Sequence, residues 1–283
     1  MAQSNLPHAL TRNFRLALSS LEARDGGSNG LLGGGGTVGV GAIGELEVTV
    51  VGIPSPTGYL LDITVLDAAL RRTATPRFCA AVRTEAATGK PTDLVQLLQE
   101  VAAATAVELP VTVASLAYRP SPFRSVAVTL NTLLQDNAMD THSPPTQGVG
   151  ALLSETFEFA AAHRLHLATL SDEENRRLFG KCNNLHGHGH NYRIEVAVAV
   201  PTDDSGSFGF AALQEVVQRE IMDRFDHKHL NIDCPEFRTL NPSVENIAKV
   251  CHDLLVGPLA KRGGALRFVR VWETDKTSCQ YPA

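Results

Sequence analysis

The sequence predicts an α+β protein made of two tandem units, each with the element order ββααββ, an antiparallel sheet and two helices. Three observations lead to this prediction. The same order of strand-like and helix-like segments occurs twice along the chain. Residues 135–150 separate the two copies, and this polar segment with two adjacent prolines has the composition of an interdomain linker. Eight of the 10 histidines lie between His163 and His252, so the chemistry should belong to the second copy.

The second unit, residues 151–283, should begin with a long hairpin. Residues 153–162 form an apolar, strand-like run, and residues 192–200 alternate polar or small side chains with β-branched ones. Between them, a capping box formed by Ser171 and Glu174, followed by Gly180, marks the start and stop of a short helix. The loop of the hairpin is therefore expected to be long and ordered.

Two amphipathic helices and a second strand pair follow. Residues 211–225 carry apolar side chains near helical spacing, and a second helical segment starts at the N-cap candidate Ser243 and runs to residue 256. Residues 265–273 and 278–281 have the composition of strands. This completes the order ββααββ.

The first unit, residues 1–134, repeats the order without the histidines. Its expected elements are residues 12–18, 45–51, 63–70, 92–101, 111–118 and 123–130. Where the second unit has its histidine-containing loop, the first has the glycine-rich stretch 26–44, which is too flexible to hold a metal site, and Ser20 stands near the position of His163. We therefore expect a degenerate copy that lacks zinc ligands.

Composition excludes several classes of protein. The chain has 283 residues, is 43% hydrophobic and only 19% charged, and carries a net charge of −5 without a basic cluster, which suits a globular protein that binds a small molecule and not nucleic acid. It has no basic leader and no stretch of about 18 apolar residues, so neither export nor membrane insertion is expected. Five scattered cysteines without a CxxC pair argue against a disulfide framework, and a cytoplasmic location is the expectation.

The segment 181–192, KCNNLHGHGHNY, predicts a metal site. His188 and His190 are two positions apart and would point to the same face of a strand. His163 ends the paired strand and can supply a third imidazole, and three histidines with one open position are the pattern of catalytic zinc. If His186 were a fourth ligand, the coordination shell would be complete and no position would remain for a substrate. The alternative is a histidine-rich loop that binds metal only adventitiously.

Cys182 is a candidate base or nucleophile, because Lys181 and a nearby metal cation would lower the pKa of its thiol. The alternative is an ordinary buried cysteine or a fourth zinc ligand. Asp226 and His227 form the carboxylate–imidazole pair that a proton relay needs, although such pairs at helix ends are commonly solvated caps, as expected for His229.

Glu273 ends an apolar strand, where a carboxylate either lies exposed at the rim or holds a hydrogen-bond donor of a ligand. The sequence leaves both possibilities open.

Together these residues resemble the family of 6-pyruvoyl-tetrahydropterin synthases and 6-carboxytetrahydropterin synthases. The matching motifs are FAAAHRLH at 159–166, FGKCNN at 179–184, GHGHNY at 187–192, DHK at 226–228, PSVEN at 242–246 and WET at 272–274. The resemblance covers about residues 153–283, and over residues 10–131 it is faint and structural only.

The resemblance implies a T-fold (tunnelling fold), in which ββααββ units assemble side by side into a barrel, so the protein should be a homo-oligomer with active sites at its interfaces. It implies one set of site residues with distinct roles: zinc on His163, His188 and His190, Cys182 as general base, Asp226 and His227 as proton relay, Glu273 as the anchor of the pterin, and Ser243 and Glu245 beside it.

The implied reaction converts 7,8-dihydroneopterin triphosphate to 6-pyruvoyl-tetrahydropterin with loss of triphosphate, which is the activity of a carbon–oxygen lyase acting on phosphates. A first alternative is 6-carboxy-5,6,7,8-tetrahydropterin synthase of queuosine biosynthesis, which the Cys-Asn-Asn sequence at 182–184 and the longer spacing to the histidines disfavour. A branch that cleaves dihydroneopterin is also disfavoured, because it typically lacks this cysteine. A second alternative is a non-catalytic pterin- or metal-binding module.

The chain departs from the family pattern in two places. Residues 205–210, SGSFGF, replace a Thr-Gly-x-Val-x-Asp motif that the first unit keeps at 57–62, and Val244 replaces a threonine that could bind the pterin. Because two units are joined in one chain, we expect three chains where single-unit relatives use six.

Overall fold

The computed structural model describes residues 7–19, 41–55, 58–130, 150–201 and 208–283. The chain divides into two compact units, Met1–Leu152 and Leu153–Ala283. Ser20, most of the glycine-rich stretch, the predicted linker except Gly150, and the first half of the segment 205–210 lie outside the described residues. Within the described part of the chain, no helix is long and apolar enough to cross a membrane.

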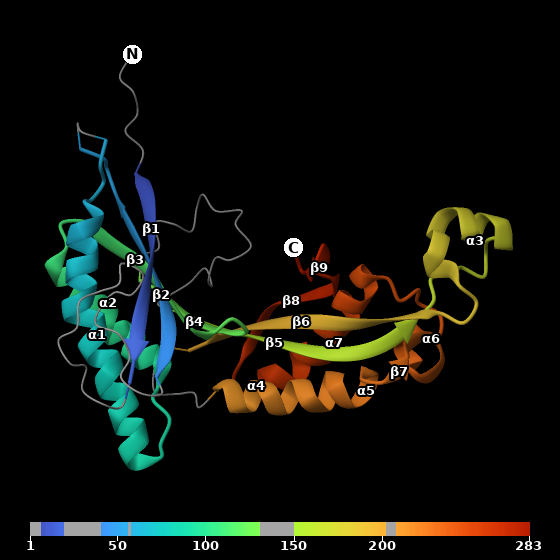
Figure 1. Ribbon diagram of the computed structural model, residues 1–283. Coiled ribbons are helices and arrows are strands. Elements are labelled where there is room, and N and C mark those ends of the chain that lie inside the picture. Colours follow the sequence, from blue (N-terminus) through green and yellow to red (C-terminus); the bar gives the residue numbers. More distant parts are fainter. Residues whose placement is uncertain (1–6, 20–40, 56–57, 131–149, 202–207) are drawn as a thin grey trace. The chain divides into compact units, whose positions relative to one another are not determined.

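Unit 1 is a four-stranded antiparallel sheet with two helices (Figure 1). Its elements are β1 His8–Leu18, β2 Ala42–Gly52, α1 Ile63–Thr88, α2 Leu94–Glu108, β3 Thr112–Ser121 and β4 Arg124–Thr129, with the strands in the order β1-β2-β3-β4. The core contains alternate side chains of β2, such as Leu46, Val48 and Val50, which are fully removed from water. The helices contact the neighbouring strands, α1 on β1 and α2 on β3 and β4. The predicted order ββααββ and the α+β class are confirmed.

Every element of unit 1 differs from its predicted bounds, and two of the differences have a clear physical reason. α1 continues past Pro76 to Thr88, because its buried stripe extends from Leu66 to Phe78 and outweighs the hydrogen bond that the proline cannot make. Gly44 belongs to β2 and not to the preceding loop. The ring of Tyr118 packs 2.5 Å from the place where a Cβ of residue 44 would be, so a side chain would displace it.

Unit 2 has the same strand pairs with extra short elements (Figure 1). Its elements are β5 Gly150–His163, α3 Asp172–Phe179, the 3-10 turn η2 Gly180–Asn183, β6 His188–Val200, α4 Phe210–Val217, the π-helical turn η3 Gln218–Met222, α5 Asp223–Phe225, β7 Lys228–His229, α6 Leu230–Asp233, the 3-10 turn η4 Pro235–Phe237, α7 Val244–Lys261, β8 Ala265–Thr274 and β9 Thr277–Tyr281. The strands follow the order β5-β6-β8-β9, and β7 pairs in parallel with β5.

The expected hairpin of unit 2 is present as the neighbours β5 and β6. Two side-chain hydrogen bonds cross it, from Ser154 to Glu195 (2.6 Å) and from Asn191 to Glu158 (3.4 Å), and their opposite progress along the chain is that of antiparallel strands. β6 begins at His188, four residues earlier than predicted from the alternation that starts at Tyr192. The histidine motif itself therefore forms the first residues of the strand.

The helices of unit 2 bury their apolar faces as predicted. Ser243 caps α7 by accepting a hydrogen bond from the amide of Asn246, and Ser171 and Glu174 form the predicted capping box of α3. The expected helix over 211–225 is interrupted by the π-helical turn Gln218–Met222, which nevertheless keeps its buried stripe. A π-helical turn adds one residue to an otherwise continuous helix, and the periodicity of apolar residues in the sequence does not reveal this addition.

Candidate metal centre and active site

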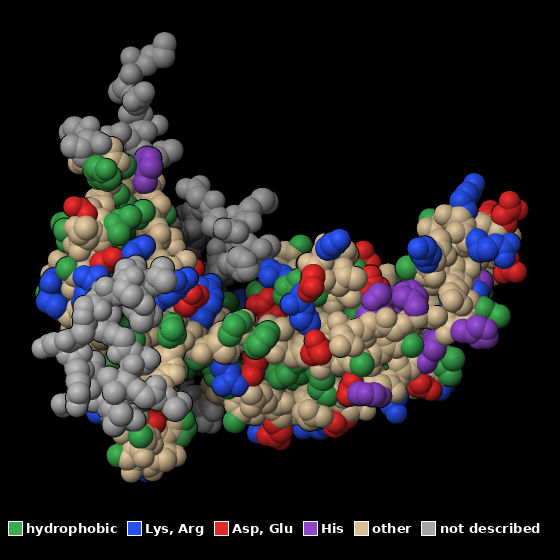
Figure 2. All heavy atoms as spheres, viewed as in Figure 1, with side chains coloured by type: hydrophobic (Ala, Val, Ile, Leu, Met, Phe, Trp, Pro, Cys, Tyr) green, Lys and Arg blue, Asp and Glu red, His purple; other side chains and the backbone are tan. Residues whose placement is uncertain are grey.

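Three strands of unit 2 bring four side chains to one point. His163 is the last residue of β5, His188 and His190 open β6, and Glu273 lies near the end of β8. One ligand atom from each of the four lies within 4.8 Å of all the others, so the group could hold a metal ion. Figure 2 shows histidine side chains gathered on this part of unit 2.

Hydrogen bonding fixes the orientation of His163. Its Nδ1 lies 2.7 Å from the carbonyl oxygen of Pro242, which can only accept, so Nδ1 carries the proton. Nε2 then presents a lone pair, and it lies 3.1 Å from Nε2 of His188. Two imidazole nitrogens at this distance must share either a proton or a metal ion. The carbonyl of Pro242 is thus an outer-shell partner of the kind that orients metal-binding histidines.

The donor set fits a metal ion. Nε2 of His190 is buried without a hydrogen-bond partner in the described part of the chain, although it lies 3.5 Å from Oε1 of Glu273. Burial, more than the neighbouring imidazoles, lowers the pKa of His188, and burial also lowers the pKa of His190. Both rings are therefore held in the neutral form that binds metals, and three imidazoles with an oxygen ligand suit Zn²⁺.

The side chain of Glu273 is partly buried and contacts a histidine of the cluster, so it is not an exposed carboxylate at the end of the strand. Its Oε1 lies 3.2 Å from Nε2 of His163, a separation at which the two atoms must share a proton or a metal ion, and this contact is the largest cause of the lowered pKa of the carboxyl group. The carboxylate is thus ionised beside three imidazoles. From this position it can serve as a fourth ligand or turn toward a bound molecule.

Cys182 lies on η2, half-buried, close enough to Glu273 to feel its charge. Burial and then the negative charge of Glu273 raise the pKa of the thiol, opposite to the lowering that the sequence suggested. Lys181, which was expected to favour the thiolate, is exposed and is not among the groups that shift this pKa. Protein side chains alone therefore keep Cys182 as a thiol, and only a bound cation would oppose them.

Asp226 and His227 form a pair at the edge of β5. Nδ1 of His227 lies 2.9 Å from Oδ1 of Asp226, and the same oxygen accepts a hydrogen bond from the amide of Ala160. The amide hydrogen bond from Ala160, then the one from His227, lowers the pKa of Asp226. His227 has a positive φ of 58° and a side chain that is 83% exposed. No hydrogen bond or ion pair joins the pair to Cys182 among residues 150–201 and 208–283.

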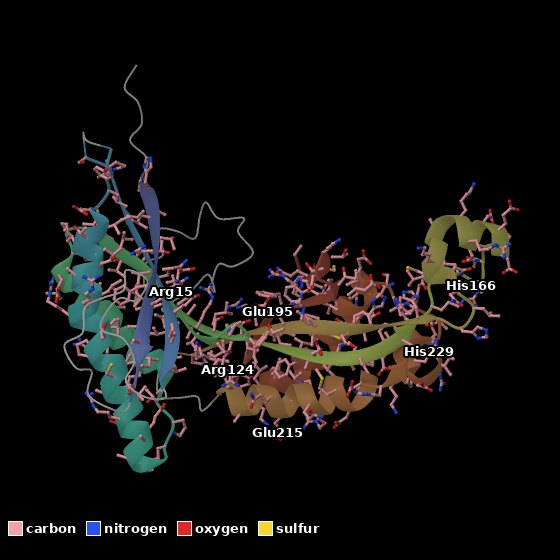
Figure 3. All side chains as sticks on the ribbon, viewed as in Figure 1. Arg15, Arg124, His166, Glu195, Glu215 and His229 are labelled. Atoms are coloured by element: carbon pink, nitrogen blue, oxygen red, sulfur yellow. The ribbon has the colours of Figure 1, made fainter. Side chains whose placement is uncertain are left out.

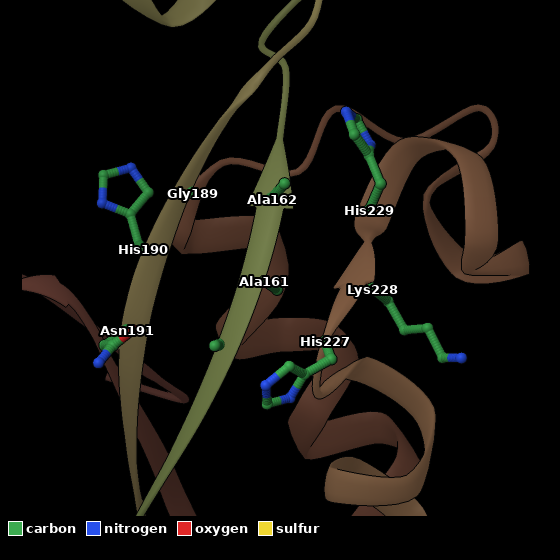
Figure 4. Close-up of a pocket in the computed structure, with 9 residues that line it drawn as sticks. Ala161, Ala162, Gly189, His190, Asn191, His227, Lys228 and His229 are labelled. Carbon is green, nitrogen blue, oxygen red and sulfur yellow. The ribbon is translucent and has the colours of Figure 1, made fainter.

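A groove of about 490 Å³ is lined by one residue of this pair and one residue of the four-residue cluster. His190 and His227 both line it, with the backbone of β5 between them (Figure 4). His229 lines it as well and is not the solvated residue that the sequence suggested, since its Nδ1 is buried and its ring packs behind Gly187. Figure 3 shows His229 and His166 at the same end of the sheet.

The two remaining candidates lie on the first turn of α7. The hydroxyl of Ser243 caps the helix, directly after the carbonyl of Pro242 that holds His163. Glu245 is exposed and faces Cys279 of β9, whose pKa it helps to raise after burial. Within residues 150–201 and 208–283, no hydrogen bond or ion pair joins the side chain of either residue to the four-residue cluster. In the described residues of unit 1, no comparable group of metal ligands occurs.

Sequence reasoning missed three contributors. The carbonyl of Pro242 carries no sequence signal, because any residue has one. The packing of His229 against Gly187 needs the parallel pairing of β7 with β5, which is too short to predict. Arg164 lies within the motif at 159–166 without a predicted role, although it lines a cavity together with His188 of the cluster.

Comparisons with known proteins match this part of the chain to one family. The family model of 6-pyruvoyl tetrahydropterin synthase matches residues 152–283. Human 6-pyruvoyl tetrahydrobiopterin synthase is 40% identical over 142 residues, which cover 48% of this chain and 97% of the relative. The Drosophila melanogaster synthase is 40% identical over 133 residues, 46% of this chain and 79% of the relative. A solved 6-pyruvoyl tetrahydropterin synthase of Caenorhabditis elegans is 32% identical, with a TM-score of 0.42, over 47% of this chain and 96% of that one.

The chain thus covers 97% of the human relative and 79% of the Drosophila melanogaster relative, and the family model matches unit 2, which contains the candidate metal centre. Through its residues 152–283, the chain belongs to the 6-pyruvoyl tetrahydropterin synthase family.

Proposed function

We propose that unit 2 is a zinc-dependent lyase that converts 7,8-dihydroneopterin triphosphate to 6-pyruvoyl-tetrahydropterin and triphosphate. The convergence of His163, His188, His190 and Glu273 within 4.8 Å, in a chain that belongs to this family, carries the proposal. The three histidines would be the zinc ligands. Bound zinc would supply Lewis acidity toward the hydroxyl oxygens of the substrate side chain.

The reaction needs proton transfers but no external oxidant. Triphosphate leaves with the electron pair of its carbon–oxygen bond, and a proton leaves the adjacent carbon. The resulting enol becomes a methyl ketone as its hydroxyl proton is lost and a proton is added to the terminal carbon. The remaining carbinol becomes a ketone while its two electrons and two protons reduce the pterin ring. We assign the first proton to Cys182, which lies beside the cluster, and the transfer to and from hydroxyl groups to the Asp226–His227 pair.

Glu273 would anchor the pterin. An ionised carboxylate can accept two hydrogen bonds from the amino and ring N–H groups of a pterin, and its lowered pKa keeps it ionised at neutral pH. Ser243 and Glu245 would flank the ring from the start of α7. Glu273 would then have to exchange its contact with His163 for contacts with the substrate.

We further propose that the active enzyme is a homo-oligomer of three chains with active sites at its interfaces. His227 is held in a strained conformation, yet 83% of its side chain is exposed, and no hydrogen bond or ion pair within the described chain joins it to Cys182. Such strain is usually retained for function, and the ring would be covered if a second chain brought its own Cys182 there. In this arrangement unit 1 would complete the barrel and its interfaces without contributing zinc ligands.

The test combines metal analysis with identification of the product. Purified full-length protein should contain about one zinc ion per chain and should release triphosphate and 6-pyruvoyl-tetrahydropterin, identified by mass. His188→Ala should lose metal and product together, because two imidazoles hold catalytic zinc poorly. His186→Ala is the matched control, since this exposed histidine of the same loop lies outside the cluster. Release of acetaldehyde would instead indicate 6-carboxytetrahydropterin synthesis, and zinc without any turnover would indicate a binding module.

A further inference from the structure

A cavity of about 810 Å³ opens beside His188, between the metal centre and α3. Three basic side chains line it: Arg164, Arg176 and Lys181. We infer that this cavity is the subsite that holds the triphosphate group of the substrate. The inference rests on the proposed function, which supplies the substrate, and it assigns residues that the catalytic roles above do not use.

The charge of the cavity is unbalanced. Asp172 is the only carboxylate among the residues that line it, so three positive charges face one negative charge, with a net charge of +2. No carboxylate of the described residues lies within ion-pair distance of the three cations. By contrast, Arg224 pairs with Glu236 and Arg270 with Glu195 elsewhere in unit 2. Unpaired cations around a cavity are the arrangement that attracts a polyanion.

Arg164 is held in place for this role. Its Nε donates to the carbonyl oxygen of Asn183 at 3.4 Å, and one of its terminal nitrogens lies 3.2 Å from Nδ1 of His166. A guanidinium has five N–H donors, so three remain for a ligand after these two contacts. The backbone amide of Arg164 also donates to Asn231, which ties the residue to the segment after β7. The cation is therefore preorganised and not a freely rotating surface group.

The wall that carries Arg176 is also rigid. The side chain of Asn175 is fully buried, and it accepts a hydrogen bond from the amide of Leu167 and donates to the carbonyl oxygens of Leu167 and Leu170. These bonds attach α3 to the loop that follows β5, so the helix does not swing freely. Figure 2 shows Lys and Arg side chains around this end of unit 2.

The position of the cavity suits the chemistry. In the substrate the triphosphate is attached to the side-chain carbon next to those that carry the hydroxyl groups, so hydroxyls near the metal ligands place the phosphates a few bonds away. His188 belongs both to the metal centre and to the lining of the cavity. As the carbon–oxygen bond breaks, negative charge grows on the leaving triphosphate, and fixed cations stabilise that charge.

The experiment measures binding of inorganic tripolyphosphate, the leaving group alone, to the zinc-loaded full-length protein by calorimetry. We expect Arg164→Gln and Lys181→Gln each to weaken it about tenfold or more, as for a lost charge-assisted hydrogen bond. Arg177→Gln is the matched control, because this exposed arginine of α3 does not line the cavity. Zinc content and circular dichroism should stay unchanged in all three variants, and inorganic phosphate should bind much more weakly than tripolyphosphate.

Two results would overturn the inference. One is wild-type affinity for tripolyphosphate in folded Arg164→Gln and Lys181→Gln variants, and the other is an equal loss in Arg177→Gln. Kinetics separate this failure from that of the proposed function. If the wild type forms product and the variants keep its KM, the subsite is wrong and the lyase stands. If the wild type forms no product but binds tripolyphosphate through Arg164, the lyase is wrong and the anion subsite stands.

Discussion

Replacing Gly187 by alanine should damage the metal centre without touching a ligand. Gly187 has a φ of 73°, in the left-handed region, and an added Cβ would lie 2.8 Å from the carbonyl oxygen of His163 and 2.7 Å from Nε2 of His229. The imidazole of His229 could rotate, but the carbonyl of His163 is backbone and belongs to a ligand residue. Either β5 or the turn before His188 must therefore move.

The structure sets the size of the effect. The left-handed conformation costs an alanine about 1–2 kcal/mol, and relieving a contact of 2.8 Å to an ordinary one near 3.4 Å needs a shift of about half an ångström. Metal sites tolerate only about 0.2 Å of change in ligand distance. We expect zinc affinity to fall about 10- to 100-fold, as for loss of an outer-shell partner, while the protein stays folded because single-domain stability is about 5–15 kcal/mol.

The assay is competition for zinc against a chromophoric chelator, with thermal unfolding followed in parallel. Gly189→Ala is the matched control, because its Cβ would meet only the carbonyl oxygen of Ala161 at 3.7 Å, an ordinary contact. Wild-type zinc affinity in Gly187→Ala, or the same loss in Gly189→Ala, would show that the close approach of Gly187 to His163 does not position the ligands.

Three further predictions follow. Cys182→Ala should keep its zinc but lose turnover by about 100-fold or more, the usual contribution of a positioned base, and loss of zinc in this variant would make Cys182 a ligand. Glu273→Gln should raise the dissociation constant of a pterin product analogue by about tenfold or more, measured by fluorescence quenching, whereas an unchanged constant would exclude the pterin anchor. In the metal-free protein, the lowered pKa values of His188 and His190 mean that the unfolded chain binds more protons below their ordinary pKa of about 6.5. The free energy of unfolding in urea should therefore fall as pH decreases from 7.5 to 5.5, and a rise would contradict the assignment of neutral, buried imidazoles.

Removal of unit 1 tests the expected assembly. Unit 2 ends its strand order at β9, and an open strand edge needs a partner. Residues 151–283 expressed alone should aggregate or change oligomeric state and lose activity, as measured by light scattering and product formation. A soluble, fully active fragment of unchanged assembly would show that unit 1 has another role.

The sequence by itself determined the class of the fold and the identity of the candidate ligands. Apolar periodicity located the strands and helices of both units, since burial imposes it locally, and the caps at Ser171 and Ser243 were readable because capping acts over three residues. The spacing of His188 and His190, with one glycine between them, predicted that both side chains lie on the same face of a strand. Each of these patterns depends only on residues that are close together in the sequence.

Only the tertiary structure decided what those residues face. The carbonyl of Pro242 on Nδ1 of His163, the carboxylate of Glu273 on its Nε2 and the packing of His229 behind Gly187 join positions that are 42 to 110 residues apart. Without a bound cation the pKa of Cys182 is raised for the same reason, because burial and the charge of Glu273 outweigh the adjacent lysine. The burial of a side chain and the charged groups around it depend on which strands are neighbours in the folded protein, and this pairing cannot be read from a single sequence.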